Sequence, residues 1–205
     1  MAKPTWLSVS PSTGSGNGTI INTGTVHTGR VAREGVVTVT AVGVASPVTY
    51  NVTQKPKAEF VEFLNGPEMA FNKEAGTLSV TGKSNSSKLT FAFVGEAFEV
   101  EVPTTYTAAG KSTNNGSAIA DDPGATAEFE FSVNLSIPTN DTVDEVERTL
   151  KVTANGAQAA QIVIKQAAGD AHIELTNLVS GGITLEADGT AVNVGVVSNT
   201  SWTVS

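Results

Sequence analysis

The sequence has no cysteine, few basic residues and no long apolar run. Its 205 residues include 12 Lys and Arg against 20 Asp and Glu, which gives a net charge of -8. Without cysteine, neither a disulfide framework nor a thiolate metal site can form. Phosphate binding needs clustered positive charge, so we expect no nucleic acid as a partner. No stretch approaches the roughly 20 apolar residues of a membrane span, and we expect no membrane partner.

Residues that carry chemistry are also scarce. The two histidines, His27 and His172, are not part of any local motif that a hydrolase triad would need. Gly110-Lys111-Ser112 matches the end of a phosphate-binding loop, but Thr105 stands where that loop requires glycine. Acidic pairs such as Asp121-Asp122 lack the spacing of a calcium loop. We therefore predict that the protein is not an enzyme and has no catalytic residue, metal or cofactor.

Thr and Val are the most informative residues that the sequence does have. Thr occurs 27 times and Val 26 times, and both have stiff β-branched side chains that suit a pleated sheet. Apolar and polar residues alternate in many short segments, whereas no segment of helical length keeps an apolar stripe. Gly, Asn, Pro and Ser separate these segments. The sequence therefore predicts an all-β fold made of sandwiches, with strands that include residues 98–102, 183–187 and 202–204.

Internal repeats divide the chain. The segments that begin at Arg33 and Arg148 share one order of features: Arg, strand, small-residue turn, strand, Gln, linker, strand. The segments that begin at Glu74 and Glu186 match each other independently, with one insertion and a shared Ser-Asn. The chain therefore contains two copies of the beginning of a domain and two copies of its end.

The order of these copies predicts an unusual domain organisation. Residues 1–54 form the second half of a domain, residues 58–166 form a complete central domain, and residues 171–205 form the first half of another domain. All eight Phe residues lie between Phe60 and Phe131, which places most aromatic core in the central domain. Neither half is large enough to bury a stable core alone, and its open sheet edges need a partner.

The two halves resemble a known domain family. The string WLSVSPSTGSGNGTI from Trp6, followed by Arg33 and VTYNVTQ, resembles the second half of a BACON domain. Residues 171–205 resemble its first half, which ends in a Ser-Asn-x-x-Trp turn and strand. The central domain keeps Ser84-Asn85 but lacks that Trp, and it resembles the broader bacterial immunoglobulin-like class. The resemblance implies immunoglobulin-like β-sandwiches, two domain equivalents in all, one of them assembled from the N- and C-terminal halves.

The resemblance also implies two settings. BACON domains are proposed as carbohydrate-binding or mucin-binding modules of secreted enzymes, and they occur in virion proteins of crAss-like phages. This sequence shows no apolar stretch of signal-peptide length, no lipoprotein cysteine and no attached enzyme domain. We therefore expect a bacteriophage capsid auxiliary (decoration or cement) protein or head fibre component. It would be assembled in the host cytoplasm and located on the capsid surface, where it would bind the major capsid protein or other virion proteins. The alternative is a carbohydrate-binding adhesion module for host glycans, with Trp6 and Trp202 as stacking surfaces.

Completion of the split domain could follow two routes. The halves meet within one chain if the two domains lie antiparallel and side by side. If the domains lie end to end, the C-terminal half completes the N-terminal half of a neighbouring chain and the protein is a homo-oligomer. A truncated chain is the third alternative. The residues that we expect at the complementation interface are Trp6, Leu7, Val9, Val194, Val196, Trp202 and Val204.

Residues 103–126 form a run of small and polar residues that is too long for an ordinary hairpin. Such loops are either disordered or ordered by a partner. We therefore expect this loop, with Tyr106, Lys111 and Ile119, and residues 1–4 to be candidates for docking on a neighbouring protein.

Overall fold

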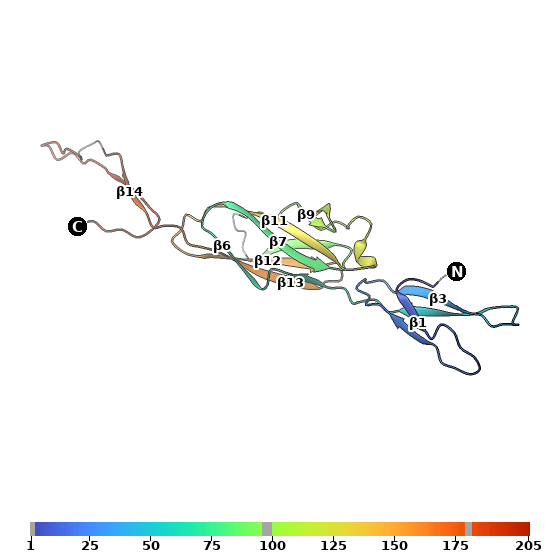
Figure 1. Cartoon of the computed structure of the whole chain (residues 1–205). Coiled ribbons are helices and arrows are strands. Elements are labelled where there is room, and N and C mark those ends of the chain that lie inside the picture. Colours follow the sequence, from blue (N-terminus) through green and yellow to red (C-terminus); the bar gives the residue numbers. More distant parts are fainter. Residues whose placement is uncertain (1–2, 96–99, 179–181) are drawn as a thin grey trace.

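The computed structural model describes residues 3–95, 100–178 and 182–205. Within these residues the regular structure consists of fifteen β-strands and one short 3-10 helix, which confirms the all-β prediction. The molecule is elongated, with three parts in a row (Figure 1). We call them the N-terminal piece (residues 3–54), the central sandwich (residues 58–166) and the C-terminal piece (the described part of residues 171–205). No helix in the described residues is long and apolar enough to cross a membrane.

The central sandwich has two sheets. The first has the strand order β10-β9-β11-β7-β5 and the second has the order β6-β13-β12-β8. The strands of the first sheet are β10 (Lys111–Asn114), β9 (Thr105–Ala108), β11 (Phe129–Ile137), β7 (Gly76–Ser84) and β5 (Val61–Phe63). Those of the second are β6 (Glu68–Phe71), β13 (Ala159–Gln166), β12 (Val146–Ala154) and β8 (Leu89–Val94).

The core lies between the inner faces of these sheets, and the alternation in the strands explains it. β11 has the sequence FEFSVNLSI, in which every second residue is apolar and buried while the polar residues face outward. β7, β12 and β13 follow the same period, as expected for strands with one buried face. The most completely buried apolar residues include Val80, Leu89, Leu135, Leu150, Val152, Ile162 and Ile164.

The N-terminal piece consists of two separate hairpins. β1 (Leu7–Ser10) pairs with β2 (Ile21–Gly24), and β3 (Arg33–Val39) pairs with β4 (Val48–Gln54). Leu7 and Val37 are its buried apolar residues. The N-terminal piece thus consists of two hairpins with only two buried apolar side chains among its described residues.

The C-terminal piece has less internal support. β14 (Ile173–Thr176) pairs with β15 (Gly195–Ser198), and these are its strands among the described residues. None of its described apolar residues is buried. The predicted strands at residues 183–187 and 202–204 are irregular here because no described strand pairs with them. The predicted strand at residues 98–102 begins among residues 96–99, outside the described residues.

Candidate assembly surfaces

The N-terminal piece consists of two two-stranded sheets, so each of its four strands has one open edge among the described strands. β2 has β1 as its only neighbour among the described strands, and β3 has β4 as its only one. Apolar side chains on these strands remain accessible, with Ile21 at 61% and Val39 at 39% exposure. Unpaired backbone donors and acceptors next to exposed apolar side chains are the usual condition for pairing with another strand.

The C-terminal piece exposes its apolar residues on a larger scale. Its exposed apolar side chains are Ile173, Leu175, Leu178, Ile183, Leu185, Val192, Val197, Trp202 and Val204. A lone two-stranded hairpin is marginally stable in water, and it gains stability when a further strand or layer covers it. The C-terminal piece is therefore a second candidate assembly surface.

The exposed apolar side chains of the C-terminal piece can be compared with buried side chains at matching positions of the central sandwich. Leu89 and Phe91 follow the Ser-Asn of the central sandwich, and they are 0% and 3% exposed. Trp202 and Val204 follow the Ser-Asn of the C-terminal piece with the same alternation after a turn that is one residue shorter, and they are 50% and 85% exposed. The same sequence pattern is thus covered in the middle of the molecule and uncovered at its end.

Asn85 holds the N-terminal piece against the central sandwich. Its side-chain amide donates to the carbonyl oxygens of Thr28, 3.1 Å away, and Ala58, 3.2 Å away. Its side-chain oxygen accepts a hydrogen bond of 3.0 Å from the Phe60 backbone N–H. Thr28 belongs to the N-terminal piece and Ala58 begins the central sandwich, so one buried amide ties the two parts together. We call this arrangement the N-terminal joint.

Ion pairs and backbone bonds reinforce the N-terminal joint. The Arg30 guanidinium forms a bidentate pair with Asp122, with 2.7 Å between Nη1 and Oδ1, and the hydrogen bond to Asp122 raises the pKa of Arg30. The backbone N–H groups of Arg30 and Val31 donate to the carbonyl oxygens of Gly124 and Ala125. The latter residues belong to a short 3-10 helix, η1 (Pro123–Ala125), of the central sandwich.

A second joint repeats the first one at the other end of the central sandwich. The Asn199 side-chain amide donates to the carbonyl oxygens of Asp141 and Asp170, each 2.8 Å away. Its side-chain oxygen accepts a bond of 2.9 Å from the His172 N–H. Asp141 belongs to the central sandwich, so Asn199 has the role of Asn85 one domain further along the chain. We call this arrangement the C-terminal joint.

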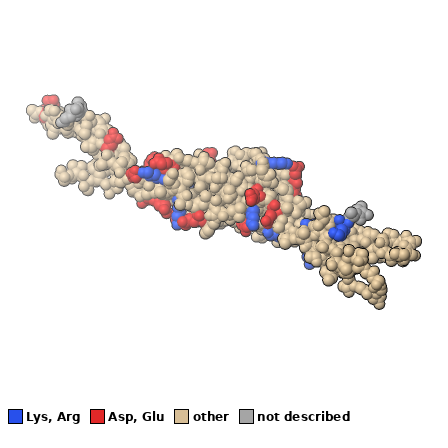
Figure 2. Space-filling model, in the orientation of Figure 1, with Lys and Arg blue, Asp and Glu red and all other residues tan. Residues whose placement is uncertain are grey.

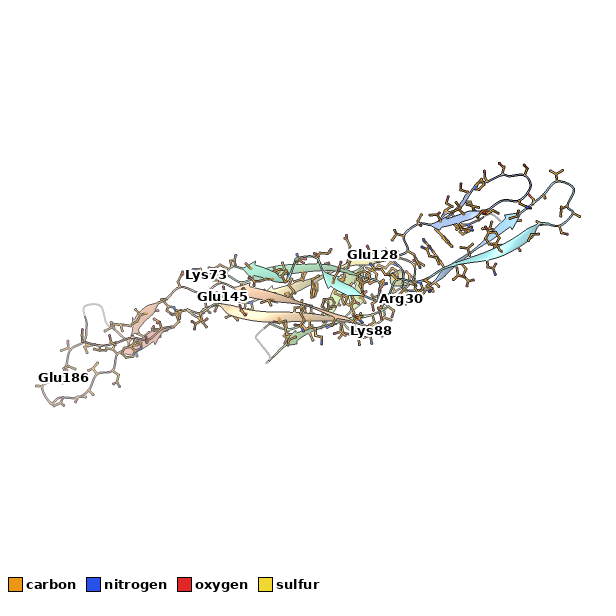
Figure 3. All side chains as sticks on the ribbon, turned by 90° about the horizontal axis from the view of Figure 1, so that it is seen from below. Arg30, Lys73, Lys88, Glu128, Glu145 and Glu186 are labelled. Carbon is orange, nitrogen blue, oxygen red and sulfur yellow. The ribbon has the colours of Figure 1, made fainter. Side chains whose placement is uncertain are left out.

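The serine before each asparagine is repeated as well. Ser84 Oγ donates to the Phe60 carbonyl at 2.6 Å, and Ser198 Oγ donates to the His172 carbonyl at 2.8 Å. In Figure 3, Arg30 and Glu128 mark the region of the N-terminal joint and Lys73 and Glu145 that of the C-terminal joint. The Ser-Asn shared by the two sequence repeats therefore supplies the hydrogen bonds that join the central sandwich to each end piece.

Asn85→Ala is expected to destabilise the chain far more than the matched change Asn199→Ala. Asn85 is fully buried, and its loss leaves two carbonyl groups and one N–H without partners, which costs about 2–3 kcal/mol of unfolding free energy. Asn199 is partly exposed, so water can replace its bonds, and we expect a loss below about 1 kcal/mol. Urea unfolding followed by circular dichroism measures both losses, and equal losses would contradict this account.

The structure does not bring the two groups of predicted interface residues together. Leu7 is buried in the N-terminal piece, and Trp6 is half-buried, with the Arg33 guanidinium carbon 4.7 Å from its ring centroid. Val194 and Val196 are partly buried, whereas Trp202 and Val204 are exposed at the opposite end of the molecule. Val9 is half-buried on β1. The two groups of residues predicted to form one interface therefore lie at opposite ends of the single chain.

The expectation that residues 103–126 are either disordered or ordered by a partner is wrong for most of this segment. β9 and β10 form a hairpin there, and β9 also pairs with β11. Tyr106 and Ile119 are core residues with 3% and 5% exposure, so they are not available for docking. Lys111 is exposed and forms an ion pair with Asp121 at 2.5 Å, which lowers the pKa of Asp121. The other docking candidate is residues 1–4, of which residues 1 and 2 lie outside the described residues.

The two histidines and the acidic pair Asp121-Asp122 do not come together in one site. His27 Nε2 lies 2.7 Å from the Val31 carbonyl oxygen, and His172 lies in the C-terminal joint, so the two histidines are at opposite ends of the central sandwich. Asp121 and Asp122 each pair with a different cation, Lys111 and Arg30. Among the described residues no group of three or more His, Asp or Glu could hold a metal ion.

The sequence did not indicate which residues join the end pieces to the central sandwich. The shared Ser-Asn indicated a repeat, but no local pattern indicated that Asn85 and Asn199 contact the preceding domain. Their partners Thr28 and Asp141 are 57 and 58 positions away. The pair Arg30–Asp122, 92 positions apart, also had no sequence signal.

Comparison with known proteins adds little. No family model matches the sequence, and no curated protein matches it. A GH5 xyloglucanase from Bacteroides ovatus, solved in complex with a XXXG heptasaccharide, is similar in structure with 12% identity and a TM-score of 0.30. The match covers 62% of this chain and 21% of that chain. A likeness at this TM-score carries no argument about function.

Proposed function

We propose that this chain is a virion structural protein, a capsid auxiliary protein that decorates or cements the capsid surface. The observation that carries the proposal is the contrast between a finished sandwich in the middle and unfinished, apolar sheet structure at both ends. Large exposed apolar patches and open strand edges mark interaction surfaces with other proteins. A protein with such a surface at each end is suited to linking components of an assembly.

The resemblance to BACON and bacterial immunoglobulin-like domains supports the same proposal. The strand orders β10-β9-β11-β7-β5 and β6-β13-β12-β8 are compatible with an immunoglobulin-like sandwich. The major capsid protein or another virion protein would be the partner, and the exposed Lys111 remains a candidate contact for it.

The surface charge distribution supports an assembly role. Figure 2 shows that most charged side chains on the visible face lie over the central sandwich, while the outer part of the N-terminal piece is almost uncharged. Depletion of charge is typical of the middle of a protein interface. The outer part of the N-terminal piece is therefore suited to contacts between proteins.

A carbohydrate-binding module is the second candidate. The half-exposed ring of Trp202 supports it, because exposed aromatic faces can stack on sugar rings. The Arg33 guanidinium lies over the Trp6 ring, so a platform built from both Trp residues is not formed. Binding on a glycan array that is lost in Trp202→Ala would favour this candidate.

Particle composition tests the proposal. We expect mass spectrometry of density-purified virions of the encoding phage to detect this chain in a fixed ratio to the major capsid protein. We also expect antibody against the central sandwich to label the outside of intact particles in electron micrographs. Absence of the chain from purified particles would overturn the proposal.

A further inference from the structure

We infer that the C-terminal piece of one copy completes the N-terminal piece of a second copy, in a register set by the central sandwich, so that copies join head to tail. The inference rests on the assembly part of the proposed function but needs no capsid. The central sandwich contains one copy of each half, already combined, and it therefore shows how the two halves fit together.

The C-terminal piece has the same strand register as the start of the central sandwich. In the central sandwich Val61 lies opposite Ser84, and in the C-terminal piece Ile173 lies opposite Ser198. The Ser-Asn hydrogen bonds at the ends of these strands are also the same. β14 and β15 are therefore equivalent to β5 and β7.

The N-terminal piece has the same register as the end of the central sandwich when the two strand pairs are aligned on Gln54 and Gln166, which matches Arg33 with Val146, two residues before Arg148. Arg33 lies opposite Gln54 in the pair β3 and β4, and Val146 lies opposite Gln166 in the pair β12 and β13. Both glutamines donate to the backbone before the preceding turn, Gln54 to the Thr25 carbonyl and Gln166 to the Pro138 carbonyl. β3 and β4 are therefore equivalent to β12 and β13, and β2 is equivalent to the end of β11.

In the central sandwich three ladders connect the two halves: β7 with β11, β8 with β12, and β6 with β13. The end pieces lack the corresponding ladders among the described residues, since β2, β3 and β4 each have an open edge and residues 202–204 have no paired strand. Each unpaired segment at one end thus has its missing neighbour at the other end.

Side-chain sizes fit this register. Val80 lies opposite Val133 in the central sandwich, and the equivalent pair between copies is Val194 opposite Ile20, also apolar. Gly82 lies opposite Phe131, and a Cβ on Gly82 would lie 2.2 Å from the Phe131 ring. The equivalent pair between copies has the sizes reversed, with Val196 in place of Gly82 and Gly18 in place of Phe131. This exchange of large and small avoids a clash between two large side chains, and the pair of Val and Gly fills less space than the pair of Phe and Gly.

The occupant is a second copy because one chain cannot bring its own ends together. Figures 1 and 3 show the end pieces at opposite ends of the central sandwich from two directions. Linkers at residues 55–57 and 167–170 extend by only about 3.5 Å per residue. The bonds of Asn85 and Asn199 also hold both pieces in their extended positions.

Charge favours contact between unlike ends. The N-terminal piece has three basic residues and one acidic residue, whereas residues 171–205 have three acidic residues and no Lys or Arg. Two C-terminal pieces therefore repel each other, while a C-terminal piece attracts an N-terminal piece. This polarity produces a head-to-tail arrangement, which closes to a ring or grows as a fibre.

Engineered cysteines test the register, and the natural chain has no cysteine that could interfere. Val152 lies opposite Phe91 in the central sandwich. The turn after Asn199 is one residue shorter than the turn after Asn85, so alignment of the alternating apolar residues places Val204 at Phe91, and we expect Val39 of one copy to lie opposite Val204 of the next. A mixture of Val39→Cys and Val204→Cys chains, oxidised mildly, should yield a disulfide-linked dimer on a non-reducing gel, with peptide mapping confirming the mixed pair. The Val39→Cys and Thr203→Cys mixture is the matched control, because residue 203 faces the opposite side of the strand, and it should stay unlinked.

A chain that carries both cysteines separates the alternatives. Assembly between copies yields a ladder of linked multimers from Val39→Cys/Val204→Cys, whereas closure within one chain yields a cyclised monomer. The cyclised monomer, or equal linking of the control pair, would overturn the inference. Purified protein suffices for these measurements, so a failure here leaves the capsid proposal to be decided by the particle experiment.

Discussion

Trp202→Asp is expected to abolish self-association of the chain without changing the unfolding of the central sandwich. In the single chain Trp202 is 50% exposed, so a charged side chain there costs little. In the completed domain this position is equivalent to Leu89, which is fully buried, and an unpaired carboxylate there costs several kcal/mol. Sedimentation velocity over a concentration series measures the association, and thermal unfolding by circular dichroism measures the fold.

Thr203→Asp is the matched control for Trp202→Asp. It adds the same charge one residue further along, at the position equivalent to the exposed Thr90. We expect this variant to associate like the unchanged chain. Loss of association in both variants would indicate that charge on the C-terminal piece acts non-specifically, and the argument from the repeat would fail.

Phe91→Ala is expected to lower the free energy of unfolding by about 3–5 kcal/mol, the usual cost of removing a buried phenyl ring. Phe91 is 3% exposed, and its ring centroid lies 5.0 Å from that of Tyr106 and 5.7 Å from that of Phe131. Both sheets of the central sandwich contact this aromatic group, so the cavity would lie in the middle of the core. Urea unfolding followed by circular dichroism measures the loss.

Val204→Ala is the counterpart of Phe91→Ala at the repeat-equivalent position. At low protein concentration, where the chain is a single copy, the 85%-exposed Val204 contributes almost nothing to the free energy of unfolding. We expect no measurable change there, but weaker association at high concentration. A loss comparable to that of Phe91→Ala in the single copy would show that residue 204 is already covered, against the structure described above.

Much of the central sandwich could be predicted from the sequence because its strands bury one face each. β11 and β12 alternate apolar and polar residues along their whole lengths, and this period is visible without a structure. The hairpin of β9 and β10 was missed because its residues are mostly Thr, Ser and Ala. Tyr106 provides most of its apolar surface, and a single large side chain does not form a pattern.

The joints could not be predicted because their partners are backbone carbonyl groups. Asn85 and Asn199 bind the carbonyls of Thr28 and Asp141, and any residue type provides a carbonyl. The sequence repeat marked the asparagines, but only the arrangement of the domains identifies what they bind.

The predicted strands at residues 183–187 and 202–204 differ from the structure for a separate reason. Both segments alternate as strands do. Residues 202–204 correspond to the start of β8, which is paired, and Ile183 corresponds to Phe71, the last residue of β6, in the repeat that matches Glu186 with Glu74. A strand needs a neighbour for its backbone groups, and the single chain does not provide one at this end. In the proposed assembly a second copy would provide the neighbouring strand. The alternation in these segments would then reflect the structure of the assembly and not that of the single chain.

Mixing two variants, each blocked at one end, tests the central claim most directly. Val39→Asp blocks the N-terminal piece on β3 and leaves the C-terminal piece intact, and Trp202→Asp does the reverse. We expect each variant alone to sediment as a monomer and an equimolar mixture to form a dimer with one copy of each and nothing larger. A mixture that stays monomeric under conditions in which the unchanged chain associates would contradict completion of one copy by the next.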